Sequence, residues 1–366
     1  MSEQDEVILR VNGTDYAGWK EISISAGILR QARDFTLSVT SKWPGQTDIP
    51  RRVQQGDKCE VFIGADKLLT GYVDATPIAY DATSITVGVK GRSKTADMVD
   101  CSAIHKTGQW KGVRVEKIAA DIAVPYGIEV IAEADTGSVM AEHQIAPGET
   151  AFECIDRMLT ARQLLVTDDA EGRAVFIKTG SGGQASTKLE YGKNILSGDA
   201  GLDYKDVYSA YLVKGQRSGT DLDNSGPACS ANGEAGDNTI ARYRNLEIQQ
   251  HGQMTDGICA DRALFEKVHR AAKALETTYT VQGWRQGDGT LWLPNQRVRV
   301  VDPVIGFDGE FLIVEVVWSK GKGGTTTSLK VGIEAGYNPV PEIKKKKGNS
   351  GWNDAGVTYV DFSKKK

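Results

Sequence analysis

The chain has 366 residues, a length that predicts two or three folded domains. Its 44 lysines and arginines against 48 aspartates and glutamates give a net charge of −4, which argues against a general polyanion binder. Hydrophobic residues at 40% and charged residues at 25% exclude a largely disordered chain. No run approaches the roughly 18 apolar residues of a membrane helix, and the acidic start at residues 1–6 argues against a secretory signal.

The cysteines indicate the redox compartment. They are odd in number, far apart and never in a CxxC pair, so they predict neither a disulfide framework nor a zinc site. We therefore expect reduced thiols, in a protein assembled in a cytoplasm. The five residues are Cys59, Cys101, Cys154, Cys229 and Cys259.

Residues 1–94 are predicted to form a first β-barrel-like domain. Val7–Val11 runs into Asn12-Gly13, a pair typical of tight hairpin turns. Asp34–Thr40 alternates apolar and hydroxyl side chains, which is the period of a half-buried strand. More short apolar runs follow at regular spacing between turn residues, as in a sandwich or barrel.

Residues 95–190 are predicted to form a small α+β domain. Val115, Ile118 and Ile122 have helical spacing. A second helix begins at Thr150-Ala151-Phe152-Glu153, which has the form of a capping box. The glycine-rich segment 179–183 is expected to be a flexible loop or domain link.

Residues 191–340 are predicted to form a second β-barrel-like domain with one long helix. The helix spans roughly Asp256 to Leu275, and its apolar face is expected to hold Leu264, Val268, Ala272 and Leu275. The polar stretch 216–237 is expected to be a long loop. Residues 341–366 differ from the rest and form a lysine-rich C-terminal tail, with seven lysines against three acids.

The two β regions share three landmarks in the same order. Each has a turn followed by a strand with charged outer residues, then a long strand after a glycine, then a closing run of nearly the same sequence. The landmarks are 56–61, Gly71 and 83–89 in one region, and 294–300, Gly309 and 327–333 in the other. A duplicated barrel follows, and three copies of such a chain can present a ring of six similar units.

Side chains suited to catalysis show no pattern. The four histidines have neither HxH nor HExxH spacing, which favours surface or structural roles over a zinc or iron site. The stretch 321–325 resembles a phosphate loop only in part, because no Ser or Thr follows Lys322 and a strand comes next, so a hairpin turn is expected. There is no GxSxG motif, and Asp168-Asp169 lies in a predicted turn, where aspartate is common.

From these patterns we expect no catalytic residue, no cofactor and no metal. A carboxylate pair for glycoside hydrolysis stays open at this point, because its separation is spatial and not sequential.

The tail combines lysine runs with an aromatic strip. The runs at 344–347 and 364–366 are typical of a solvated tail, although a nucleic-acid contact is the alternative. Trp352, Tyr359 and Phe362 lie between the runs, in a β-prone context. They are candidate partner-binding residues that dock by strand addition, and folding back onto their own chain is the alternative.

Several motifs together resemble one protein family. The opening Leu9–Gly13 and the segment Gly148–Phe152 are similar to the baseplate hub proteins of contractile-tailed, Mu-like phages. The most specific stretch is Tyr279–Arg285 followed by Gly289–Asn295, which resembles the pattern before the last strands of that family. Late-control tail proteins and the hub region of VgrG spikes are its relatives. The resemblance covers residues 7 to 338 and leaves the tail unmatched.

The resemblance implies a structural function. Hub proteins of this family are homotrimers whose paired β-barrel domains build a pseudo-sixfold ring between tail tube and central spike. The implied partners are the chain itself, the spike, the tube and other baseplate proteins, with DNA passing transiently through the lumen. The implied location is the virion tail, without a membrane segment or cofactor. The alternatives are a hub of a secretion-type injection machine, or a cell-wall hydrolase or glycan-binding tail protein.

Overall fold

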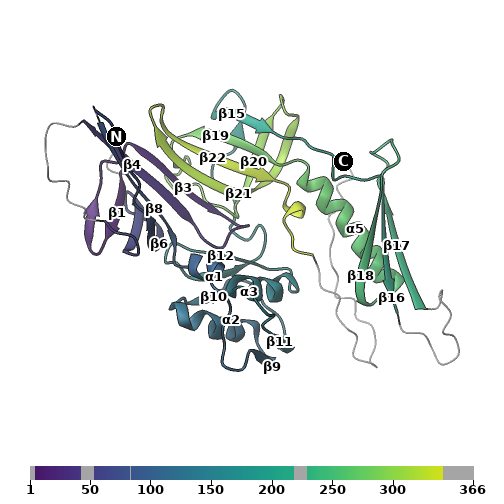
Figure 1. The fold of residues 1–366 in the computed structure, drawn as a ribbon. Helices are drawn as coiled ribbons and strands as arrows, with labels where there is room; N and C mark the ends of the chain where they lie inside the picture. Colours follow the sequence, from purple (N-terminus) through teal and green to yellow (C-terminus); the bar gives the residue numbers. More distant parts are fainter. Residues whose placement is uncertain (1–4, 43–52, 83, 218–228, 341–366) are drawn as a thin grey trace.

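A computed structural model describes residues 5–42, 53–82, 84–217 and 229–340 (Figure 1). Strands dominate, as expected, and a few helices accompany them. No described helix is long and apolar enough to cross a bilayer. Trp352, Tyr359 and Phe362 lie outside the described residues.

In the first region, the described residues up to Ser93 form strands joined by turns and short connections, without an α-helix. Its hairpin at Asn12-Gly13 forms as predicted, because both residues adopt the positive φ that a tight two-residue turn requires. The strands are β1 (Val7–Val11), β2 (Thr14–Tyr16), β3 (Glu21–Gly27), β4 (Asp34–Lys42), β5 (Lys58–Ile63), β6 (Asp66–Ala75), β7 (Ile78–Tyr80) and β8 (Ser84–Ser93).

The middle region mixes helices and short strands around its own core. The predicted capping box is present: the Glu153 amide donates to Thr150 Oγ1 at 3.1 Å, and the Thr150 amide donates to Glu153 Oε2 at 2.8 Å. Val115, Ile118 and Ile122 are buried together. The elements are α1 (Ala96–Asp100), β9 (Gln109–Val113), α2 (Val115–Ala123), η2 (Val124–Tyr126), β10 (Val130–Ala132), β11 (Met140–Gln144), α3 (Ala151–Thr160), β12 (Leu165–Asp168) and β13 (Ala174–Ile177).

The third region returns to strands and carries the longest helix. The stretch 321–325 is the β21–β22 hairpin, where Gly321 pairs with Gly324, so the expected turn is confirmed. The elements are β14 (Leu189–Glu190), β15 (Ile195–Ala200), β16 (Ala210–Gln216), β17 (Ser230–Gly236), β18 (Asn245–Gln253), α5 (Asp256–Lys273), β19 (Thr277–Gln282), β20 (Arg297–Asp302), β21 (Phe307–Gly321), β22 (Gly324–Gly332) and η3 (Glu334–Gly336).

One 14-stranded sheet joins the two outer regions. The strand order β5-β6-β8-β4-β3 in the first region recurs as β20-β21-β22-β19-β15 in the third, so the repeated landmarks correspond to a repeated strand module. The two modules meet where β3 pairs antiparallel with β21. Their largest apolar core is also shared, and it includes Leu9 and Phe35 from one region with Trp284 and Trp318 from the other.

The sheet is open, so the expected barrel closure is not found. β15 pairs with β19 alone among the described strands, and β7 pairs with β8 alone. Sequence periodicity shows which face of each strand is buried, but it does not show which edges meet, because edge pairing depends on backbone groups present in every residue.

A small sheet, β17-β16-β18, packs against α5 at one end of the molecule (Figure 1). The expected loop at 216–237 is wrong for its last part, because residues 230–236 form β17, paired along β16. Glycine and alanine make this strand look like a loop, yet the packing requires small residues. A Cβ on Gly233 would lie 2.0 Å from the Ala260 amide nitrogen of α5.

The predicted apolar face of α5 is only partly correct. The helix lies where expected, but the Leu264 side chain is 38% exposed. Ala272 is buried as predicted. The buried face also holds Cys259 and Ala263, which were not predicted, and they pack against the small sheet, whose close approach favours small side chains.

The segment 179–183 is a turn fixed by one side chain, not a free link. The Gly180 amide donates to Asn295 Oδ1 at 2.7 Å, and Asn295 Nδ2 donates to the Lys178 carbonyl at 3.0 Å. Asn295 itself is buried, in a left-handed conformation. The turn therefore connects the middle region to the second strand module through defined hydrogen bonds.

Candidate functional site

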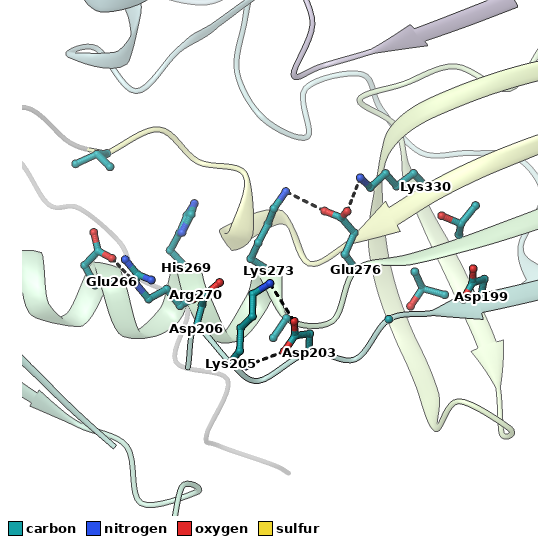
Figure 2. Close-up of a pocket in the computed structure, with 15 residues that line it drawn as sticks. Asp199, Asp203, Lys205, Asp206, Glu266, His269, Arg270, Lys273, Glu276 and Lys330 are labelled. Carbon is teal, nitrogen blue, oxygen red and sulfur yellow. Dashed lines mark hydrogen bonds and ion pairs between the residues drawn. The ribbon is translucent and has the colours of Figure 1, made fainter. Parts of the chain in front are cut away.

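A charged pocket of about 620 Å³ lies between α5 and the edge of the main sheet (Figure 2). One wall is the C-terminal half of α5, which contributes His269, Arg270 and Lys273. The opposite wall follows β15 and the segment 201–206. Acidic and basic side chains alternate around it, so neither sign of charge dominates.

Glu276 is the best-connected acid of this pocket. It accepts a 2.8 Å hydrogen bond from Tyr337 Oη, forms an ion pair of 2.8 Å with Lys273 Nζ, and forms a second ion pair with Lys330. Burial alone would raise the pKa of Glu276, but the hydrogen bonds from Lys273, Lys330 and Tyr337 outweigh burial and lower the pKa to about 2.

A second acid, Glu266, is held between two arginines of its own helix. Its carboxylate contacts Arg262 at 2.5 Å and Arg270 at 2.7 Å, each one helical turn away. His269 stacks on Phe265 with ring centroids 5.3 Å apart, and burial lowers the pKa of His269. The negative charges of both acids are thus balanced by neighbouring basic side chains. The pocket therefore has the features of a structural contact between α5 and the sheet.

Three possible metal ligands come together in the middle region, although their sequence spacing gave no signal. His143 Nε2 lies 3.2 Å from Cys154 Sγ, and a Glu149 carboxylate oxygen lies within 4.8 Å of both atoms. The carboxylate already accepts from the Ala146 amide at 2.9 Å and from Arg157 at 3.0 Å.

This group has the properties of a closed hydrogen-bond network. Burial and the hydrogen bond to Glu149 raise the pKa of the Cys154 thiol to about 12, which disfavours the thiolate that a metal or a nucleophilic reaction needs. The guanidinium of Arg157 also opposes a further cation at the carboxylate. The group therefore fits a structural role better than a metal or catalytic one.

The acids at 168–169 have two different roles, one of which the sequence did not indicate. Asp169 is the turn residue expected, accepting from the Glu171 and Arg173 amides. Asp168 is buried at the end of β12, and Arg33 Nε donates to it at 3.2 Å. Arg33 belongs to the first region, so this ion pair fixes that region to the middle one.

Two strand edges that lack a second partner among the described residues expose apolar side chains. On β7, Ile78 is 51% and Tyr80 82% exposed. Beside β15, Leu202 is 44% exposed, and residues 196–199 are exposed throughout. Unpaired edges present rows of N–H and C=O groups to another chain. Sequence reasoning missed these edges and named aromatic residues of the tail instead, which lie outside the described residues.

Comparisons with known proteins agree with this architecture. Three family models match successive parts of the chain: "Mu phage baseplate assembly protein GpP-like, N-terminal" over 6–93, "Baseplate hub protein gp44-like, second domain" over 95–178, and "Mu phage baseplate assembly protein GpP, fourth domain" over 255–340. Baseplate hub protein gp44 of Escherichia phage Mu is 31% identical over 361 residues, which cover 96% of this chain and 94% of gp44.

The chain belongs to the Mu-like baseplate hub proteins. A solved relative, the 43 kDa tail protein of prophage MuSo2 from Shewanella oneidensis, has 30% identity and a TM-score of 0.83, with 92% of this chain and 100% of that one covered. A type VI secretion component of E. coli is 11% identical with a TM-score of 0.53, covering 91% and 80%, and it shares the fold.

Membership confirms the resemblance read from the sequence and makes this hub protein a structural component of the phage tail.

Proposed function

We propose that this hub protein forms a homotrimeric, pseudo-sixfold ring that joins the tail tube to the central spike. The observation that supports it most is the repeated strand module, joined edge to edge through β3 and β21 inside one chain. Three copies bring six such modules, which is the number that matches a sixfold tube, while the trimer as a whole has the threefold symmetry of a spike.

The ring is proposed to let DNA pass during ejection and to act without catalysis. A net charge of −4 suits a conduit, because a strongly basic lumen would retain the polyanion. The relatives are named as hub and tail proteins, which supports a structural role. We propose the domain bounds 1–94, 95–190 and 191–340, and assembly of the particle in the host cytoplasm.

The C-terminal tail, residues 341–366, is proposed to contact the spike or another baseplate protein. Trp352, Tyr359 and Phe362 supply apolar anchors in a β-prone segment, the combination that strand addition uses.

The trimer is tested by the mass of the purified protein in solution. Light scattering over a range of protein and salt concentrations is expected to give about three times 39.6 kDa. A chain that stays monomeric at every concentration, with the spike protein present as well as absent, would contradict the ring.

A further inference from the structure

The two modules can be matched in register, because β6–β8 and β21–β22 carry the same irregularity. On β6 the pairing with β8 shifts between Val73 and Ala75. On β21 the pairing with β22 shifts between Ile313 and Glu315. A bulge adds one residue to a strand and so marks its register. Matching the bulges makes Ala75 the counterpart of Glu315.

The other ladders carry this correspondence to the remaining strands, except past Val61, where β5–β6 has a bulge that β20–β21 does not have. The chain from 75 to 80 corresponds to 315–320, and β15 with the residues after it corresponds to β3. The corresponding pairs are Cys59–Gly71 with Val298–Phe311, Leu37–Val89 with Tyr279–Leu329, Ile22–Leu37 with Gly198–Tyr279, and Ile78–Val87 with Trp318–Thr327. The β7–β8 and β21–β22 ladders keep the same offset beyond the bulges, so the correspondence holds along the whole of 75–80.

The junction inside the chain shows what this edge of a module binds. Trp318 of β21 lies opposite Ile24 of β3, and both side chains are fully buried. The ladder continues past β3, where the Ile28 amide donates to the Val314 carbonyl at 2.9 Å. The first module's counterpart of this β21 edge is 75–80, and the second module's counterpart of β3 is β15. Both lack a second strand partner among the described residues.

We propose that these two free edges pair with each other between copies, and that the contact repeats the internal β3–β21 junction. β15 and residues 201–203 of one copy add antiparallel to residues 75–80 of the next. Ala200 then lies opposite Ile78, and Leu202 lies opposite Thr76. The contact is head to tail, so it leaves neither of these two edges unpaired once the ring closes. This inference rests on the proposed trimer and names its interface.

Pro77 is compatible with this pairing. Its carbonyl accepts from the Gly88 amide at 2.8 Å, so its backbone faces β8 and not the free edge. Backbone groups alternate in direction along a strand, so the groups that face outward belong to Thr76 and Ile78. Both of these residues keep their N–H, and the proline removes no donor from the proposed ladder.

Pairing would also cover the exposed apolar side chains of both edges. The internal junction buries Ile24 and Trp318, and their counterparts are Ala200 and the half-exposed Ile78. Leu202 is the counterpart of Ala26, which is buried. An open edge with apolar side chains is an aggregation hazard in a monomer, whereas in a ring it becomes part of an interface.

Cysteine cross-linking of the full chain tests the register. With Cys101→Ser and Cys229→Ser as background, two matched variants carry Ile78→Cys with Ala200→Cys, or Thr76→Cys with Leu202→Cys. Two swapped variants recombine the same four substitutions, Ile78→Cys with Leu202→Cys and Thr76→Cys with Ala200→Cys. Directly opposite residues have Cα atoms about 5.5 Å apart, whereas diagonal neighbours are about 7–8 Å apart, beyond disulfide reach.

We expect the matched variants to oxidise to covalent trimers, on the order of tenfold faster than the swapped ones, because only their geometry fits a disulfide. A bond within one chain is excluded, since β19, β22, β21, β3, β4 and β8 separate β15 from β7. If the matched variants do not cross-link faster, light scattering of the reduced variants shows whether the interface or the trimer itself is wrong. A trimer whose matched pairs cross-link no faster than swapped pairs would overturn the interface and leave the proposed ring standing. If the native chain and the variants all stayed monomeric, with the spike protein present as well as absent, both the interface and the ring would be overturned.

Discussion

Glu276 shows at the level of one residue how burial and charge oppose each other. Its pKa of about 2 lies below that of a free glutamate, so the ionised form is bound more tightly in the folded chain than in the unfolded one. The stabilisation is therefore complete above the unfolded pKa of roughly 4.3, and it is lost as the pH falls toward 2.

We predict that Glu276→Gln lowers the free energy of unfolding by about 1–2 kcal/mol at pH 7, because charge-assisted hydrogen bonds from Lys273, Lys330 and Tyr337 are weakened. Denaturant unfolding at pH 7 and pH 3 should show the difference from the native chain shrinking at the lower pH. Glu142→Gln is the control, since its ion pair with Lys111 is exposed. If the difference in unfolding free energy between Glu276→Gln and the native chain grew as the pH fell, the lowered pKa of Glu276 would be contradicted.

Single residues were predictable from sequence where their role is local. The Thr150 capping box and the Asn12-Gly13 turn depend on neighbours within three residues, and both formed as expected. Asp168 was interpreted as a turn residue, and that was wrong, because its partner Arg33 lies 135 residues away. The His143–Cys154 contact spans only 11 residues, but it joins strand β11 to helix α3, so neither strand nor helix periodicity indicated it.

At the level of elements, α5 can approach β17 closely because Gly233 has no side chain. The space at Gly233 is occupied by the α5 backbone, with Ala260 N 2.0 Å from where a Cβ would stand. Backbone cannot yield as the end of a flexible side chain can, so any larger residue must displace the helix.

We predict that Gly233→Ala costs about 1–3 kcal/mol of stability, the usual range for overpacking a dense contact. Gly236→Ala is the matched control, because the same strand offers open space there, with nothing within 4 Å of an added Cβ. Thermal unfolding followed by circular dichroism compares the two. Equal melting temperatures for both variants would show that the packing of α5 against β17 does not require a glycine at position 233.

The elements themselves were predictable from periodicity, except where packing required small residues. β17 was interpreted as a loop because Ser230–Gly236 has little apolar character, and its partner α5 was assigned an exposed leucine on its buried face. Both errors have one cause: hydrophobic pattern measures how apolar a face is, whereas a close helix–sheet contact selects for size.

At the level of the whole molecule, the duplication was visible in the sequence, but its register was not. The similar runs 83–89 and 327–333 do fall on the corresponding strands β8 and β22. The ladders, however, match Val89 with Leu329, four residues away from the match by sequence, because bulges fix the register and leave no signature in composition. Sequence reasoning therefore could not show which strand edges of the two modules correspond to each other.

Separate surfaces for the ring and for the tail lead to a prediction about truncation. A chain that ends at Val340 keeps β15 and residues 75–80, so its trimer mass should be unchanged. The truncated chain should no longer bind the spike protein, because the strip with Trp352, Tyr359 and Phe362 is removed. Pull-down and calorimetry measure this binding.

Two full-length variants then separate aromatic from charged contributions. Serine at the three aromatic positions should abolish binding at every salt concentration, since strand addition relies on apolar anchors. Glutamine at 344–347 and 364–366 should weaken binding mainly at low salt, since exposed charges are screened within about 10 Å at 0.1 M. If the truncated trimer still binds every partner, the tail is no docking segment, and the spike must meet the ring itself.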